Sequence, residues 1–235
     1  MSGRPVCNAA AQRIAMQTLS RMHELIQVGM SEADIAGIAC RLMKENGSGE
    51  LRSNSAAAMV LLGERNALRQ SGKDYLPDPG SLVSENDVIT IDLSPSIGGY
   101  RGGCARTFFM EEGKLAPEDS PVLPENRRGM EAELHLHEYL LNQLDPGMSY
   151  GRAFEILNGV IEGMGFVNAG FRGILGRSIG TGEQGEILIM KGNPVTFRQA
   201  GKPFSLETCI RRMEGGAVFR RKDIYYIDGD RFARL

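Results

Sequence analysis

Cysteine, whose thiolate can bind a metal or attack a substrate, is the first residue type in this chain that could do chemistry. The four cysteines are Cys7, Cys40, Cys104 and Cys209, with long, irregular gaps and no CxxC pair. This spacing predicts neither a thiolate zinc site nor a disulfide framework. Such cysteine usage favours a reducing, cytoplasmic location.

Histidine, the usual general base near neutral pH, is scarce. The three histidines are His23, His135 and His137, and all three fall in stretches predicted to be helical. Histidines in such positions are expected to be solvated or satisfied by hydrogen bonds rather than catalytic. The sequence therefore contains no recognisable pair of nucleophile and histidine base.

A basic cluster near the C-terminus is the third candidate. It comprises Arg211, Arg212 and the run Arg220-Arg221-Lys222. The cluster could form a surface for an acidic partner, although alternation along strands would leave half of these side chains in solvent. The whole chain carries 27 basic and 29 acidic residues, for a net charge of −2. This balance argues against a nucleic-acid-binding protein.

The elements that position such residues must come from one domain of ordinary composition. The chain has 235 residues, of which 42% are hydrophobic and 24% charged, and these values fit one large α/β or α+β domain. No window approaches the ~20 apolar residues of a membrane span. The first residues lack the apolar run of a signal peptide. We therefore expect no membrane association.

Two segments of the sequence resemble each other. Both contain a His-Glu pair, a Gly-Met-Ser turn and an amphipathic helix that ends at glycine. Ser149 follows Ser31 by 118 positions, and Gly165 follows Gly47 by the same number. Each serine is predicted to be a helix N-cap, and each glycine suits the position after the helix. The alternative is two unrelated helices that share good capping residues.

The remaining segments are predicted to be strands, with one further helix. Residues 87–94 and 104–110 are rich in β-branched or aromatic residues and flank a Gly-rich turn, which predicts a hairpin. A long helix is predicted over residues 125–144. Residues 204–210 and 217–227 again have the composition of strands. The order of helices, strands, helices and strands indicates two α+β halves that share one sheet.

Several motifs together resemble the superfamily of methionine aminopeptidases, Xaa-Pro peptidases and creatinases. The central match is Asn86–Leu93, followed by Gly99-Tyr100 and Ala105–Phe108. Further matches lie at Gly63–Leu68, Pro146–Tyr150, Gly176–Gly180 and Leu206-Glu207. The resemblance implies the pita-bread fold: an α+β domain over residues 1–235 with a shared curved antiparallel sheet. Its two pseudo-symmetric halves are expected near residues 1–115 and 116–235, which fits the internal repeat.

The same resemblance implies that a metal site has been lost. Active peptidases of this superfamily hold two metal ions with two Asp, one His and two Glu. Asp92 matches the first Asp and Glu207 the first Glu, whereas the other three positions fall at Gly103, Arg177 and near Arg221. Arginine is always charged and has no acceptor for a metal. We therefore expect no metal and no other cofactor.

Creatinase shows that the superfamily can act without metal, but its chemistry depends on histidine. The resemblance places one such histidine at Gln70 and a further one at Gln184 or Gly185. Because none of these positions is histidine, neither peptidase nor creatinase chemistry is expected to transfer.

The refilled pocket is expected to hold charged and polar groups. Arg177, Arg221, Gln70 and Arg101 would bind a carboxylate or phosphate, with the arginines leaving the pocket cationic on balance. Asp92 and Glu207 would act as general acid and base. Alternatively, Asp92–Arg177 and Glu207–Arg221 pairs would neutralise each other. Cys104, next to the lost ligand position, is a candidate nucleophile, with a buried structural thiol as the alternative.

Two classes of function follow. The first is a metal-independent, diverged enzyme that acts on a small anionic substrate by lyase, isomerase, cyclase or hydrolase chemistry. The alternative is a catalytically inactive pseudopeptidase that binds a peptide or protein partner. In either case we expect a cytoplasmic protein, with homodimerisation as its candidate assembly and no nucleic-acid or membrane partner.

Overall fold

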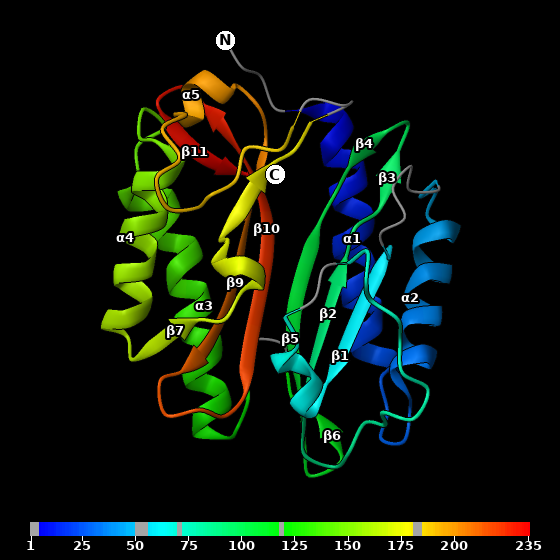
Figure 1. Cartoon of the computed structure of the whole chain (residues 1–235). Helices are drawn as coiled ribbons and strands as arrows, with labels where there is room; N and C mark the ends of the chain where they lie inside the picture. Colours follow the sequence, from blue (N-terminus) through cyan, green and yellow to red (C-terminus); the bar gives the residue numbers. More distant parts are fainter. Residues whose placement is uncertain (1–4, 50–55, 70–71, 118–119, 181–184) are drawn as a thin grey trace.

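The computed structural model describes residues 5–49, 56–69, 72–117, 120–180 and 185–235 (Figure 1). The first part of the chain contains α1 (Val6–Leu25), α2 (Glu32–Glu45), β1 (Ala58–Leu62), η1 (Gly63–Ala67), β2 (Asp87–Leu93), β3 (Ser96–Ile97), β4 (Tyr100–Arg101), β5 (Cys104–Glu111) and β6 (Lys114–Leu115). The second part contains α3 (Pro124–Gln143), α4 (Tyr150–Gly163), β7 (Phe166–Asn168), η2 (Phe171–Gly173), β8 (Gly176–Ser178), α5 (Phe197–Ala200), β9 (Phe204–Arg212), β10 (Val218–Asp228) and β11 (Arg231–Arg234).

One antiparallel sheet connects the two parts of the chain. Its central order is β1-β2-β5-β10-β9-β7, and β6, β11 and β8 extend β5, β10 and β9 respectively. The two parts meet where β5 pairs with β10, with Ala105 opposite Lys222. This arrangement confirms the predicted α+β fold with a shared antiparallel sheet.

Two pairs of helices pack on the sheet, each over the strands of its own part of the chain (Figure 1). Ser31 caps α2 by accepting a hydrogen bond from the backbone of Asp34, and Ser149 caps α4 by accepting one from Arg152, each at 3.1 Å. Gly47 and Gly165 follow these helices with φ of 92° and 84°, a region that favours glycine. The predicted caps are thus confirmed, whereas the boundary of the halves near residue 115 stays a prediction.

The predicted hairpin is present, but its connection has structure of its own. β2 and β5 pair antiparallel from Asp87↔Met110 to Leu93↔Cys104. Between them β3 and β4 form a small separate ladder around Gly98 and Gly99, both of which have positive φ. This arm turns the chain back toward α1, where Asn8 donates a side-chain hydrogen bond to the carbonyl of Arg101 (2.8 Å).

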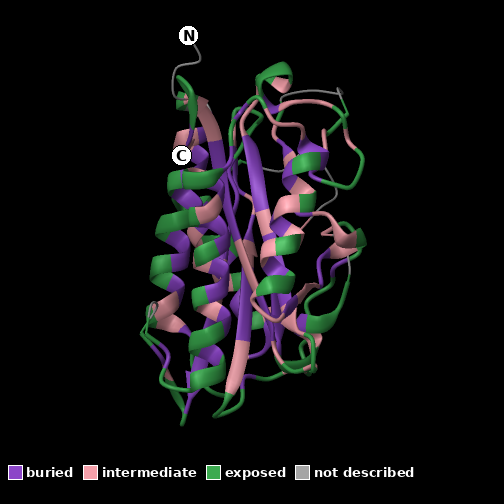
Figure 2. Cartoon of the chain, turned by 90° about the vertical axis from the view of Figure 1, so that its left-hand side faces the viewer, coloured by how far each residue is buried: buried purple, intermediate pink, exposed green. Residues whose placement is uncertain are grey.

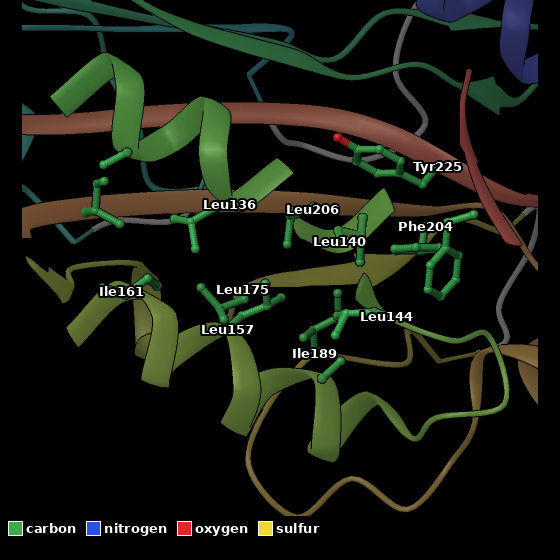
Figure 3. Packing of buried hydrophobic residues seen from close by; sticks show 14 of the residues in the cluster. Leu136, Leu140, Leu144, Leu157, Ile161, Leu175, Ile189, Phe204, Leu206 and Tyr225 are labelled. Carbon is green, nitrogen blue, oxygen red and sulfur yellow. The ribbon is translucent and has the colours of Figure 1, made fainter. Parts of the chain in front are cut away.

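Apolar side chains fill the space between the helices and the sheet. In the second part, Leu136 and Leu140 of α3 and Leu157 and Ile161 of α4 pack near Leu206 of β9 (Figure 3). Figure 2 shows that buried residues follow the inner sides of the helices and the central strands, while exposed residues follow the outer helix surfaces. Within the described residues no helix is long and apolar enough to cross a membrane.

Gly129 marks the closest approach of α3 to β10. A Cβ atom at this position would lie 2.3 Å from the ring of Phe219. We predict that Gly129→Ala lowers the free energy of unfolding by about 1–3 kcal/mol, because such overpacking forces the helix away from the sheet. Urea denaturation followed by circular dichroism measures this change.

Gly159 in α4 provides the matched control, since a Cβ atom there meets nothing within 4 Å. Gly159→Ala should be neutral or stabilise the protein by up to about 1 kcal/mol through helix propensity. Equal effects of the two substitutions would contradict the tight contact between α3 and β10.

Candidate functional site

The candidate site lies on the face of the sheet that is turned away from the four long helices. Asp92 of β2 is opposite Ala105 of β5, Ala105 is opposite Lys222 of β10, and Lys222 is opposite Glu207 of β9. Residues paired across neighbouring strands project to the same face. The register therefore brings Asp92, Lys222 and Glu207 into one row across four strands.

Lys222 is the centre of this row. Its ammonium donates hydrogen bonds to Oδ1 of Asp92 and, at 3.3 Å, to the hydroxyl of Ser94. The residue is only 7% exposed. Burial by itself opposes the charge, but the carboxylates of Asp92 and Glu207 outweigh it and raise the pKa of Lys222 above its ordinary value. Lys222 is therefore a fixed buried cation at neutral pH.

Glu207 is held as an anion by its neighbours. Its Oε1 accepts a hydrogen bond from the hydroxyl of Ser205 (2.7 Å) and lies 3.3 Å from Nε of Arg177. Burial favours the protonated form, but Arg177 and Lys222 dominate and lower the pKa of Glu207. Both predicted acid/base residues are thus paired with a cation: Glu207 with Arg177, and Asp92 with Lys222.

A chain of ion pairs continues to the edge of the site. Nη1 of Arg177 donates to Glu186 at 2.9 Å, and the other oxygen of Glu186 lies 3.7 Å from Nη1 of Arg101. Arg101 belongs to β4 and Arg177 to β8, so Glu186 connects the two parts of the chain. Among these described groups three cations face three anions, which does not support the expected excess of positive charge. The pairs Asp92–Lys222 and Glu207–Arg177 replace those considered from the sequence.

Arg221 lies on the opposite face of β10, and its predicted place in the pocket is wrong. Its Nε lies 3.2 Å from Oδ2 of Asp223, on the face that β10 shares with the buried Phe219 and Tyr225. The next residue, Lys222, lies directly opposite Glu207 and faces the site in its place. The sequence could have predicted this, because side chains alternate along a strand. Arg221 is two residues from Phe219 and four from Tyr225, so all three project to the same face.

Cys104 also lies on the helix-covered face and has the features of a structural thiol. It is 1% exposed and packs among the apolar residues beneath α1 and α2. Burial raises the pKa of Cys104 to about 12, so the thiol is neutral and a poor nucleophile. Its predicted place among the catalytic residues is therefore not supported. Gln70 and Gln184 lie outside the described residues.

A buried polar cluster supports the site from beneath, between α3 and β9–β10. His137 contacts the hydroxyl groups of Tyr225 (2.7 Å) and Thr208 (3.2 Å). Burial lowers the pKa of His137 to about 3, so the ring is neutral. Burial also raises the pKa of Glu133, which accepts a hydrogen bond from Thr208, to about 8. His137 is thus a buried residue whose ring nitrogens both have hydrogen-bond partners. This is one of the two environments predicted for the histidines, the other being exposure to solvent.

The residues present do not fit a pair of metal ions. Gly103 supplies no side-chain ligand, and a Cβ atom there would lie 3.0 Å from Cε of Lys222. The ammonium of Lys222 bonds to Asp92, where a metal would need that carboxylate. No group of three or more potential metal ligands occurs in the described part of the chain. Fixed cations therefore replace the donors that a metal pair requires.

The pKa of Glu133 leads to a prediction about stability. Because the pKa is raised, the folded state keeps a proton that the unfolded state releases between about pH 4.5 and 8. The stability that this proton contributes is present below pH 4.5 and is lost as pH rises through this window. Glu133→Gln should remove that loss and exceed the wild type in stability by several kcal/mol at pH 8, since each pKa unit corresponds to about 1.4 kcal/mol.

Urea denaturation at a series of pH values checks this prediction. Glu131→Gln removes a charge from the exposed side of the same helix and is the control. Parallel stability curves for wild type and Glu133→Gln would show that Glu133 is ionised in the folded protein.

Comparison with known proteins agrees with this geometry. The metallopeptidase family M24 matches residues 7–230. Solved structures similar to the chain include an X-Pro aminopeptidase from Thermotoga maritima (TM-score 0.76, 19% identity, 97% of this chain and 59% of that one) and the prolidase from Pyrococcus furiosus (0.75, 21%, 97% and 62%). A methionine aminopeptidase from Thermotoga maritima has a TM-score of 0.73 at 14% identity, with coverage of 100% and 98%.

These similar structures support the pita-bread fold. Their sequence identity to the chain is too low to show a shared activity. The chain spans about three-fifths of the length of the X-Pro aminopeptidase and the prolidase. No curated protein matches the sequence. The family match covers nearly the whole chain, and the site has lost its metal-binding donor set. The chain therefore belongs to metallopeptidase family M24, as a diverged member.

Proposed function

We propose that this protein is a metal-independent member of its family that binds a peptide without hydrolysing it. The observation that carries the proposal is the ammonium of Lys222, which lies between Asp92 and Glu207 at the centre of the site. A lysine at this place neutralises the carboxylates internally. It does not activate a water molecule as a metal ion does.

The protonation states of the site favour binding over acid–base catalysis. A general acid or base works best when its pKa lies near the working pH. Here the pKa of Glu207 is lowered and that of Lys222 is raised, so each keeps its charge at neutral pH. The metal-independent enzyme expected from the sequence needs one of these groups to exchange protons, and this geometry supports that reaction less well.

A peptide is the ligand class that the fold favours. The similar structures carry the names of aminopeptidases, dipeptidases and prolidases, and the candidate site occupies the sheet face where the resemblance placed the metal ligands. Lys222 and Arg177 offer donors to the carbonyl oxygens of a bound peptide, while Asp92 and Glu186 offer acceptors to its N–H groups. Binding would therefore exploit the polar groups that hydrolysis no longer needs.

Incubation with an equimolar pool of tetrapeptides tests the proposal. Mass spectrometry should find every peptide intact, and part of the pool should raise the Tm of the protein. A peptide present at 100 times its Kd adds about 2.7 kcal/mol of stability. The double variant Asp92→Asn/Lys222→Met should lose this stabilisation, and Arg212→Gln, whose partner is the exposed Glu214, should retain it. Cleavage that persists after chelation would overturn the proposal in favour of the enzyme.

Restoring the missing donors tests the assignment of the metal position. Wild-type protein should show no Mn²⁺ binding by isothermal titration calorimetry, because Lys222 competes for Asp92. The triple variant Gly103→Asp/Arg177→His/Lys222→Glu should gain Mn²⁺ binding. The matched variant Gly103→Asp/Arg177→His/Arg221→Glu should not, since residue 221 faces the helices. Binding by the second triple variant alone would show that the assignment to Lys222 is wrong.

A further inference from the structure

A second row of polar side chains lies beside Lys222 on the same face of the sheet. Thr90 of β2 is opposite Thr107 of β5. The hydroxyl of Thr107 exchanges hydrogen bonds with the backbone of Arg220 at 2.8 and 3.1 Å. Arg220 is two residues from Lys222 and therefore projects to the same face.

Arg211 extends this row diagonally. Val218 is opposite Arg211 on β9, and Arg220 is opposite Cys209. Diagonal neighbours on one face of such a ladder are about 7–8 Å apart, a distance that long side chains can cover. The side chains of Arg211 and Arg220 therefore begin as diagonal neighbours on this face of the sheet.

Both arginines have a buried polar atom without a partner, and so does Thr90 on β2. Nε of Arg211, Nε of Arg220 and the hydroxyl of Thr90 are all inaccessible and make no hydrogen bond in the described structure. Thr90 is fully buried. Each such atom costs about 1–3 kcal/mol when it stays unpaired. The two arginine atoms belong to diagonal neighbours on β9 and β10, and this pair indicates a place where a ligand supplies the missing acceptors.

The charge at this place differs from that around Lys222. Arg177 and Lys222 have carboxylate partners, whereas in the described part of the chain no carboxylate forms an ion pair with Arg211 or Arg220. The nearby Cys209 supplies no negative charge, because burial raises the pKa of its thiol. The Nη2 group of Arg220 is fixed by the carbonyls of Asn66 (3.1 Å) and Leu68 (3.0 Å). Its guanidinium is thus positioned in advance, and no carboxylate among the described residues forms an ion pair with it.

We propose that Arg211 and Arg220 form a subsite for an oxyanion, a carboxylate or a phosphate. Guanidinium groups with free N–H donors bind such planar or tetrahedral anions through charge-assisted hydrogen bonds. Arg220 and Lys222 are two residues apart on one face of β10, about 7 Å along the strand, so one ligand can contact both. The inference rests on the proposed function only in assigning the anion to a bound peptide, as a C-terminal or side-chain group.

Arginine Nε–Hε resonances of ¹⁵N-labelled protein report directly on the unpaired atoms. Succinate and inorganic phosphate are the two probes, and their separate titrations distinguish a carboxylate from a phosphate site. We expect saturable shifts of the Arg211 and Arg220 signals with at least one probe. Arg211→Gln should weaken anion binding at least about tenfold. Arg211→Lys keeps the charge but loses the paired guanidinium donors, so its affinity should lie between those of wild type and Arg211→Gln. Arg212→Gln should bind like wild type.

Two results would overturn the subsite. One is the absence of saturable shifts at Arg211 and Arg220 with both probes. The other is a set of shifts that is equal at Arg212 and unchanged in Arg211→Gln, which would show non-specific ion binding. Arg211 is the primary target because Arg220 also holds the segment at Asn66, and circular dichroism verifies the fold of each variant.

The experiment separates this inference from the proposed function. Arginine shifts without any peptide binding would support the subsite and contradict the peptide ligand. Peptide binding that leaves both arginine signals in place would support the proposed function and contradict the subsite.

Discussion

The ion pair between Lys222 and Asp92 is the interaction on which the arrangement of the site depends. Lys222 lies on β10 and Asp92 on β2, so the lysine side chain must cross the intervening strand β5. It can do so because the residues beneath its path, Gly103 and Ala105, carry little or no side chain. Removing one partner of a fully buried pair typically costs about 3–5 kcal/mol, and the cost here should be smaller because the Asp92 side chain is 23% exposed. The pair therefore connects the two parts of the sheet as well as filling the site.

Alternation along β10 divides a single run of charged residues between two environments. Arg220 and Lys222 project toward the open face of the sheet, whereas Arg221 and Asp223 project toward the helices. Asp223 contacts Arg106 at 2.8 Å and Arg221 at 3.2 Å, so both buried guanidinium groups have the same carboxylate as partner. The strand thus separates Lys222, which pairs with Asp92 on the open face, from Arg221, which pairs with Asp223 on the helix-covered face.

Local signals in the sequence were sufficient to predict the helices and strands. The alternation of side chains along each strand decided which site residues could be predicted correctly. The caps at Ser31 and Ser149 follow from short-range hydrogen bonds, and the antiparallel pair β2–β5 follows from composition. Asp92 and Glu207 do share one face, as the family motifs implied. Arg221 was misplaced because a shift of one residue in a strand moves a side chain to the other face. Glu186 could not be predicted, since its contacts with Arg101 and Arg177 depend on tertiary structure alone.

Gly103 and Lys222 depend on each other physically, because the lysine side chain passes close to the glycine. A Cβ atom at residue 103 would lie 3.0 Å from Cε of Lys222, so a side chain there would require the lysine chain to shift. Without Lys222, the carboxylates of Asp92 and Glu207 would lack the cation that lies between them. The glycine makes room for the lysine and the lysine compensates the acids. A substitution at either position alone therefore disturbs packing or charge, whereas a concerted change can preserve both.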